Sequence, residues 1–232
     1  MHHVIKVILF LFITSSNLAY ATDVDSKNTV KFLNEIFEDN DVFTKKYTPE
    51  FFQKFANHQH PNSTYLGCAD SRVHLESIDQ TPQNDIFSIR NIGNQMVTSE
   101  GSIDYGVEVL KTKYLIIMGH SACGAVTAAI AKKKTNLPAI DKELETIKLS
   151  KTELNEAIIE NVHNQVSYAM NKYKTKIDDG SLVILGMIYD FRNDFGSGVG
   201  EVILVNENGQ TDAKKLKALY NEEVKHINFL SN

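Results

Sequence analysis

The chain has 232 residues, of which 42% are apolar and 23% are charged, and its formal net charge is −5. This length suits one globular domain rather than two independent ones, because a typical domain spans roughly 100 to 200 residues. Lysine and arginine are scattered along a chain of negative net charge, which argues against a partner that is nucleic acid or an anionic membrane. The composition therefore favours a small-molecule partner.

The first residues are typical of a secretory signal peptide. Met1–Lys6 is short and basic, Val7–Ile13 is entirely apolar, and residues 19–21 (AYA) fit a small-x-small cleavage site. A membrane anchor is the alternative, but the apolar run is far shorter than the roughly 20 residues that span a bilayer. We therefore expect a signal peptide at residues 1–21, a single mature domain at residues 22–232, and an exported protein that is periplasmic or secreted.

A helical arm is predicted after the cleavage site. Apolar residues recur at helical spacing between Lys27 and Asn57, with a predicted break at Asn40-Asp41. The aromatic side chains of this arm could pack in the core of their own chain or against a second subunit. The sequence leaves both possibilities open.

From Pro61 onward, short apolar runs alternate with helical patterns. The predicted strands are Thr64–Cys68, Ile86–Ile89, Tyr114–Gly119, Leu182–Ile188 and Glu201–Val205. The predicted helices are Gly101–Leu110, Gly124–Lys134, Asp141–Lys174 and Thr211–Lys225. This alternation predicts an α/β fold with a mainly parallel central sheet flanked by helices on both faces. The short connection before Glu201 predicts an antiparallel edge strand.

Chemically distinctive residues follow two of the predicted strands. Cys68, Asp70 and Arg72 come at the end of the first strand, and His120 and Cys123 come at the end of the third. Ligand sites in open parallel sheets form at the carboxyl ends of the strands, so we expect these residues to lie close together. Two cysteines and a histidine suit zinc, and three protein ligands leave a fourth position for water or for Asp70.

The two cysteines also allow a disulfide. For an exported chain with an even cysteine count, a bond between Cys68 and Cys123 is the default expectation. In that case His120 would be an ordinary polar residue. The spacing alone does not decide between the disulfide and the metal site.

A serine hydrolase is a further alternative. Residues 119–123 (GHSAC) nearly match the G-x-S-x-G nucleophile elbow, and Asp190 and His226 follow in the order that a triad of this type requires. However, Cys123 stands where the elbow needs its second glycine. The hydrolase interpretation also leaves Cys68 without a role.

The residues around the two cysteines resemble motifs of the beta-class carbonic anhydrases. Residues 68–73 (CADSRV) resemble the family's C-x-D-S-R motif, and residues 120–126 (HSACGAV) resemble its H-S-x-C-G motif. Weaker similarities occur in the family's order at Arg90–Asn94, Gly101–Gly106, Asn161, Val162, Gln165 and Gly186–Asp190. Together they cover most of the sequence after the signal peptide.

This resemblance implies a catalytic domain that reversibly hydrates carbon dioxide to bicarbonate and a proton through a zinc-bound hydroxide. Cys68, His120 and Cys123 would be the metal ligands. Asp70 and Arg72 would form a catalytic pair, in which the guanidinium keeps the carboxylate ionised to accept a hydrogen bond from the zinc-bound water. In some members the pair breaks and the aspartate becomes the fourth ligand, which here would be Asp70.

The resemblance also bears on assembly and regulation. The family forms dimers and often tetramers, so we expect a homodimer or homotetramer in which the N-terminal helices contact the neighbouring subunit. Some members have an inhibitory bicarbonate pocket built from Trp, Arg and Tyr, and the matching positions here are Tyr65, Arg90 and Tyr189. Because the chain has no tryptophan, we expect Arg90 to make structural hydrogen bonds instead.

Two other functions are compatible with the same motifs. Related sequences hydrolyse carbon disulfide or carbonyl sulfide on the same zinc site. Alternatively, a secreted protein of this fold could hold zinc or a disulfide without catalysis. The presence of Asp70 and Arg72 argues against an inert site, which has no need of them.

Overall fold

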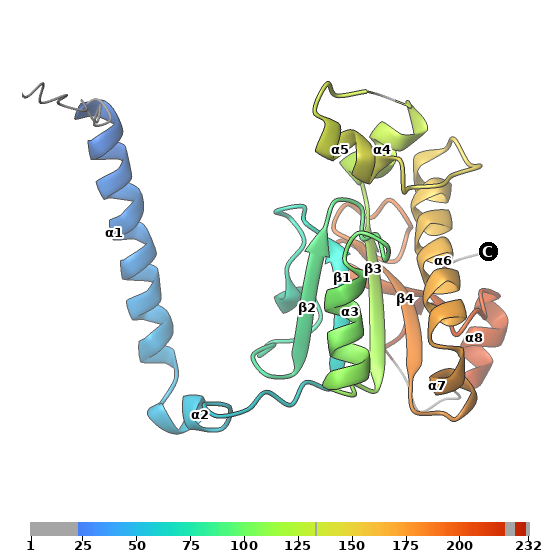
Figure 1. Cartoon of the computed structure of the whole chain (residues 1–232), viewed down its shortest axis with the longest axis horizontal. Helices are drawn as coiled ribbons and strands as arrows, with labels where there is room; N and C mark the ends of the chain where they lie inside the picture. The colour runs from blue at the N-terminus through green and yellow to red at the C-terminus, as the bar shows by residue number, and fades with distance from the viewer. Residues whose placement is uncertain (1–22, 133, 221–225, 231–232) are drawn as a thin grey trace, which may run out of the picture. The chain divides into compact units, whose positions relative to one another are not determined.

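The computed structural model describes residues 23–132, 134–220 and 226–230 (Figure 1). The predicted signal peptide at residues 1–21 lies outside the described residues. The chain divides into two compact units, Met1–Ala56 and Asn57–Asn232. Within the described ranges, no helix has the length and apolar character needed to cross a bilayer.

The first unit contains two helices. Helix α1 (Asp23–Lys46) runs through Asn40-Asp41, so the predicted break there was wrong. Asn and Asp have only modestly weaker helix propensity than Ala, and the flanking residues sustain the helix. The interruption comes at Thr48, whose backbone is extended, and Pro49 then begins α2 (Pro49–Gln53). The proline ring disfavours helical backbone at the preceding residue, which explains why the break lies there.

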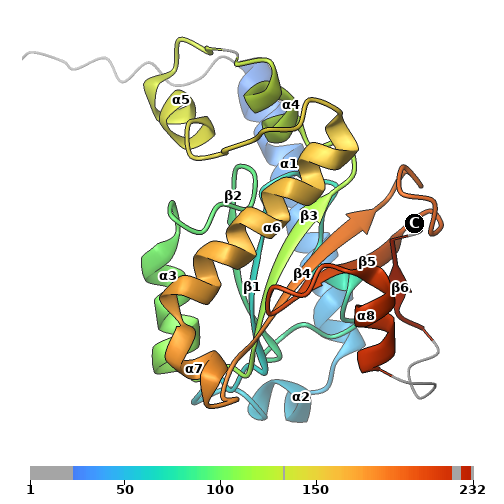
Figure 2. The ribbon, with the colours of Figure 1, turned by 90° about the vertical axis from the view of Figure 1, so that its right-hand side faces the viewer.

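One mixed sheet forms the centre of the described part of the second unit, with the strand order β2-β1-β3-β4-β5-β6 (Figure 2). The strands are β1 (Ser63–Cys68), β2 (Ile86–Asn91), β3 (Tyr114–His120), β4 (Val183–Asp190), β5 (Glu201–Glu207) and β6 (Asn228–Phe229). The first four strands pair in parallel and β5 pairs antiparallel to β4, as predicted. The prediction that β5 lies at the edge of the sheet was wrong, because the short strand β6, which was not predicted from the sequence, pairs in parallel with β5 on its other side.

Helical segments connect and cover these strands. They are the 3-10 turn η1 (Leu75–Ser77), α3 (Glu100–Asp104), the π-helical turn η2 (Tyr105–Val109), α4 (Gly124–Ile130), α5 (Pro138–Leu144), α6 (Leu154–Lys172), α7 (Lys174–Asp178) and α8 (Ala213–Leu219). The single helix predicted at Asp141–Lys174 was wrong, because a loop separates α5 from α6. Glu160 accepts hydrogen bonds from the backbone N–H groups of Ser150 and Lys151, both at 2.9 Å. These contacts satisfy backbone donors of the loop without a helix.

Helix α6 packs closely on one face of the sheet (Figures 1 and 2). Two glycines of the sheet permit this approach, because a Cβ atom on Gly119 would lie 2.7 Å from Val162, and one on Gly186 would lie 2.9 Å from the same residue. The π-helical turn η2 covers β1 on this face, with Gly106 against Thr64. The resulting core supports the two strands that end in the distinctive residues, β1 and β3.

The opposite face of the sheet carries apolar side chains that are only half-buried within this unit. Along β4, buried and half-buried residues alternate strictly. The half-buried set includes Leu185 and Met187, and the second of these lines a hollow of about 450 Å³ together with Ile116 and Val202. Both faces of β4 are therefore apolar, which explains why its sequence is a continuous apolar run.

Substitution of Gly106 by alanine tests the close packing of η2 on the sheet. A Cβ atom at this position would lie 2.1 Å from Thr64 Oγ1 and 3.0 Å from Phe87 Cδ1. We expect Gly106→Ala to lower the free energy of unfolding by about 1–3 kcal/mol, as overpacking of a core does. Gly101→Ala is the matched control, because no neighbour lies within 4 Å of its Cβ position. Equal urea midpoints for the two variants would contradict this packing.

Candidate metal centre

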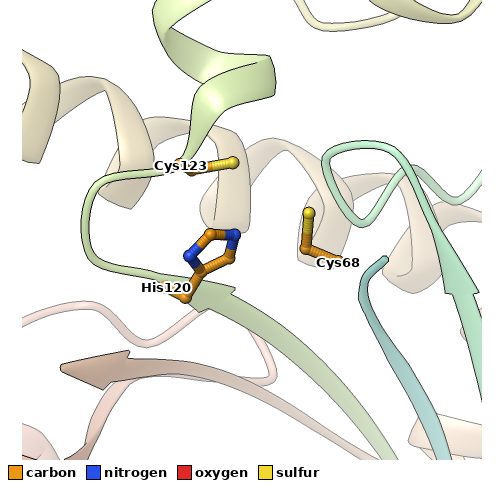
Figure 3. Close-up of side chains that lie close together, drawn as sticks. All are labelled: Cys68, His120 and Cys123. Atoms are coloured by element: carbon orange, nitrogen blue, oxygen red, sulfur yellow. The ribbon is translucent and has the colours of Figure 1, made fainter. Parts of the chain in front are cut away.

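Three side chains converge where β1 and β3 end. Cys68 is the last residue of β1, His120 is the last residue of β3, and Cys123 directly precedes α4. All three are buried, with exposed fractions of 6%, 0% and 1%. Their candidate ligand atoms lie within 4.8 Å of one another, and Figure 3 shows the two sulfur atoms and the imidazole facing one common space. The structure thus brings together the three predicted metal ligands.

A tight turn between β3 and α4 places His120 and Cys123 on the same side. Ala122 has a φ of 53°, in the left-handed region that residues other than glycine rarely adopt. The N–H of Ser121 donates to the carbonyl of Tyr189 at 3.0 Å, which ties the turn to β4. Backbone strain of this kind typically costs about 1–3 kcal/mol and is found where a site requires it.

His120 presents an unpaired nitrogen to the cluster. Its Nδ1 lies 2.9 Å from the carbonyl oxygen of Ser121, and because a carbonyl only accepts, Nδ1 carries the proton. Nε2 is then an acceptor, and it is buried without a hydrogen-bond partner among the described residues. Buried polar atoms are normally paired, so an unpaired Nε2 beside two sulfur atoms fits a bound metal ion.

The two cysteines are free thiols that share a hydrogen bond. This hydrogen bond from Cys123 is the largest cause that lowers the pKa of Cys68, and the neighbouring His120 ring lowers it as well. The same interaction raises the pKa of Cys123, as does its burial. The pair therefore favours one thiolate at Cys68 even without a cation. Two sulfurs and an imidazole nitrogen form a donor set that suits zinc.

Asp70 and Arg72 form a bidentate ion pair beside the cluster. Arg72 Nε donates to Asp70 Oδ1 at 2.8 Å, and Nη2 donates to Oδ2 at 2.6 Å. The Arg72 side chain is the largest cause of a lowered pKa at Asp70, so the carboxylate stays ionised. Asp70 Oδ2 also lies 4.0 Å from His120 Nε2. The carboxylate is thus both at the edge of the cluster and turned towards Arg72.

Arg90 stabilises the backbone from Cys68 to Asp70. Its Nε donates to the carbonyl of Cys68 at 3.0 Å, and its Nη2 donates to the carbonyl of Asp70 at 2.6 Å. The structural hydrogen-bonding role predicted for Arg90 is confirmed. Tyr65, which the resemblance matched to the tryptophan of the inhibitory pocket in other members, is 2% exposed.

Phe191 was not predicted from the sequence. The guanidinium carbon of Arg72 lies 4.7 Å from the centre of the Phe191 ring, and the His120 ring lies 6.0 Å away at an interplanar angle of 24°. Phe191 directly follows β4, which is the parallel neighbour of β3. Its place beyond the carboxyl end of a central strand was the signal that could have identified it.

The structure does not support the serine hydrolase alternative. The Asp190 carboxylate accepts backbone hydrogen bonds from Arg192, Asp194 and Phe195, so it stabilises a loop rather than orienting a histidine. Ser121 Oγ has no hydrogen-bond partner among the described residues. A nucleophilic serine would need a neighbouring base.

Comparison with known proteins decides the family. The sequence model of the family described as carbonic anhydrase matches residues 63–198, which is more than half of the chain. The chain belongs to the carbonic anhydrase family. The match includes Cys68, Asp70, Arg72, His120 and Cys123, so both motifs lie inside the part of the chain that defines the family.

Individual carbonic anhydrases share parts of this sequence. The carbonic anhydrase of Emericella nidulans is 38% identical over 117 residues, which cover 46% of this chain and 51% of that protein. Carbonic anhydrase 2 of Mycobacterium tuberculosis is 32% identical over 146 residues, which cover 56% of this chain and 70% of that protein. The chain therefore spans about half of the Emericella relative and more of the Mycobacterium relative.

A solved structure shows that the fold is that of the beta class. A tetrameric beta-carbonic anhydrase from Sordaria macrospora superposes with a TM-score of 0.63 and 24% identity, covering 77% of this chain and 98% of the other. The resemblance to beta-class carbonic anhydrases that the two motifs indicated is confirmed.

Removal of one thiol tests whether the cluster binds a metal. We expect Cys68→Ala to reduce the zinc content of the purified protein from a single ion per chain to nearly none, because two remaining ligands seldom retain zinc. His74→Ala is the control, since His74 is an exposed histidine close to the cluster in sequence. Elemental analysis of both variants makes the comparison, and full zinc content in Cys68→Ala would contradict the ligand assignment.

Proposed function

We propose that the protein is an enzyme that reversibly hydrates carbon dioxide to bicarbonate and a proton, with zinc held by Cys68, His120 and Cys123. The observation that carries this proposal is the buried cluster of two thiols and an unpaired imidazole nitrogen beside an ionised carboxylate. Membership of the carbonic anhydrase family supports the same reaction. When bound, zinc supplies a water nucleophile at neutral pH, because it lowers the pKa of water from 15.7 towards about 7.

Asp70 orients the attacking water in this proposal. Both of its oxygens face donors of Arg72, so the carboxylate is ionised and can only accept hydrogen bonds. A water molecule between Asp70 Oδ2 and the ligand cluster would donate a hydrogen bond to Asp70 and keep its proton. Its lone pair would then be directed away from the carboxylate, towards carbon dioxide.

The proton released by the reaction needs a different acceptor. Because the hydrogen bonds from Arg72 lower the pKa of Asp70, this carboxylate is too weak a base to store a proton at neutral pH. Asp70 therefore positions the water, and buffer or another side chain receives the proton. The division of roles matches the rule that a general base needs a pKa near the working pH.

Exchange of Asp70 for asparagine tests this role. Asparagine keeps the shape but can donate as well as accept, and it no longer pairs with Arg72 as an anion. We expect Asp70→Asn to retain zinc while kcat/KM for carbon dioxide hydration falls about 10- to 100-fold. Stopped-flow assays of Asp70→Asn and of the control Asp178→Asn make the comparison. Asp178 pairs with Lys174 on the exposed surface of α7.

Three outcomes separate the alternatives. Unchanged turnover in Asp70→Asn would refute the positioning role. A wild-type protein with zinc but no hydration of carbon dioxide would favour carbon disulfide or carbonyl sulfide as substrate, or a site without catalysis. A protein that contains no zinc and no reactive thiols would favour the alternative in which Cys68 and Cys123 form a disulfide.

We also propose that the protein is a homodimer or homotetramer. Apolar side chains of α1 are exposed, namely Val30, Phe32, Leu33, Ile36, Phe37 and Val42. A second apolar surface lies on the half-buried face of the sheet. Large exposed apolar patches are typical of surfaces that bind another protein, and the Sordaria macrospora enzymes are tetrameric.

Export is a further proposal, supported by the signal-peptide pattern of residues 1–21. We expect the protein isolated from its native cell to begin near Thr22. Sequencing of its N-terminus, with whole-cell fractions as a control for unprocessed precursor, provides the measurement. An intact Met1 in the accumulated protein would contradict export by this route.

A further inference from the structure

Arg72 has two separate sets of contacts. The edge of its guanidinium donates to Asp70, and Nη2 also donates to the carbonyl of Ala122 at 3.3 Å. The guanidinium also lies over the Phe191 ring, with its carbon atom 4.7 Å from the ring centre. The Arg72 side chain is nevertheless 49% exposed. A half-exposed arginine side chain competes with water for its partners, so contacts with neighbouring groups help to hold it against Asp70.

Phe191 is suited to provide that restraint because its own backbone is fixed. It follows Asp190, a fully buried residue whose carboxylate accepts N–H groups at 3.3 Å from Arg192, 2.9 Å from Asp194 and 2.7 Å from Phe195. The carbonyl of Asp190 also accepts the N–H of Gly200 at 2.8 Å. The loop that carries the phenyl ring is thus closed by four hydrogen bonds to one residue.

The ring also contacts the metal cluster itself. Phe191 stacks against His120 with ring centres 6.0 Å apart and an interplanar angle of 24°. Arg72 and His120 therefore share one aromatic neighbour. Stacking on a guanidinium removes water from one of its faces and adds a cation–π attraction, while leaving its in-plane donors free for the carboxylate.

We infer that Phe191 is a positioning residue that holds Arg72 in the orientation in which it engages Asp70. The inference rests on the proposed function for its catalytic consequence, but not for its structural one. Without the ring, the long side chain of Arg72 can leave Asp70 and extend into water. Asp70 is then free to turn from the position in which it would orient the attacking water.

Arginine NMR offers a direct test, because Arg72, Arg90 and Arg192 are the only arginines of the sequence. Their three Nε–Hε signals can be recorded on the zinc-loaded protein, and Arg72→Lys assigns the signal of Arg72. A proton near the face of an aromatic ring is shielded, so we expect Phe191→Leu to move the Arg72 signal downfield and to speed its exchange with water. The Arg90 signal serves as the internal reference.

Two further variants test whether the aromatic ring of Phe191 itself holds Arg72, rather than the general packing of its loop. Phe191→Tyr keeps the ring and should preserve both the signal and the turnover of the wild type. Phe195→Leu removes a different ring of the same loop, one that packs against the hydrophobic core, and should leave the Arg72 signal in place. We expect Phe191→Leu to retain zinc and to lower kcat/KM for carbon dioxide roughly 3- to 30-fold, the range expected for loss of a cation–π contact.

The two readouts distinguish failure of this inference from failure of the proposed function. If Phe191→Leu leaves the shift and exchange rate of Arg72 unchanged, the inference is overturned whatever happens to turnover. If Phe191→Tyr fails to preserve the signal, the ring is not the cause and the inference is likewise overturned. If the wild type does not hydrate carbon dioxide but the Arg72 signal responds as expected, the proposed function fails and the positioning of Arg72 stands.

Discussion

The parallel pairing of β1 with β3 is the constraint on which the site depends. The register places Gly67 opposite Met118, so the carboxyl ends of the two strands lie side by side. Cys68 then stands at one strand end and His120 at the other, and the turn through Ala122 adds Cys123. The fold thereby brings Cys68 together with two residues that lie 52 and 55 positions further along the chain, with all three ligand atoms within 4.8 Å of one another. No flexible loop is needed to assemble it.

Charge then determines what the cluster can do. In the proposed function, two thiolates would neutralise the charge of a divalent cation, so the groups around the candidate ligands would have to orient the water nucleophile by hydrogen bonding. The Asp70 carboxylate has this capacity because Arg72 keeps it ionised and Arg90 fixes the backbone from Cys68 to Asp70. Phe191 completes the arrangement from β4. The chemistry therefore depends on three neighbouring parallel strands, of which only two supply the candidate metal ligands.

Sequence patterns revealed the parts of the molecule that depend on local chemistry. The apolar runs of β1, β3 and β4 were sufficient to predict a parallel sheet, and the two motifs indicated the cluster and the Asp70–Arg72 pair. The break between α5 and α6 was missed because it depends on Glu160, whose side chain satisfies backbone donors of a loop. The break predicted in α1 was wrong because two weak helix formers do not interrupt a long helix, whereas Pro49 does.

Phe191 and β6 show a different limit of sequence reasoning. A single phenylalanine after a strand is an ordinary core residue by pattern, and its role is visible only when Arg72 and His120 are found beside it. The strand β6 has two residues and gains its conformation from pairing with β5, so its sequence alone carries no strand signal. Both features depend on contacts between distant parts of the chain.

The most direct test of the account removes and restores the metal. Zinc is extracted from the protein with a chelator, carbon dioxide hydration is measured by stopped flow, and zinc is then returned to the same sample. The account predicts that turnover disappears with the metal and recovers when a single zinc ion per chain is bound again. Turnover that is unaffected by extraction, or a fully zinc-loaded protein that never hydrates carbon dioxide, would contradict it.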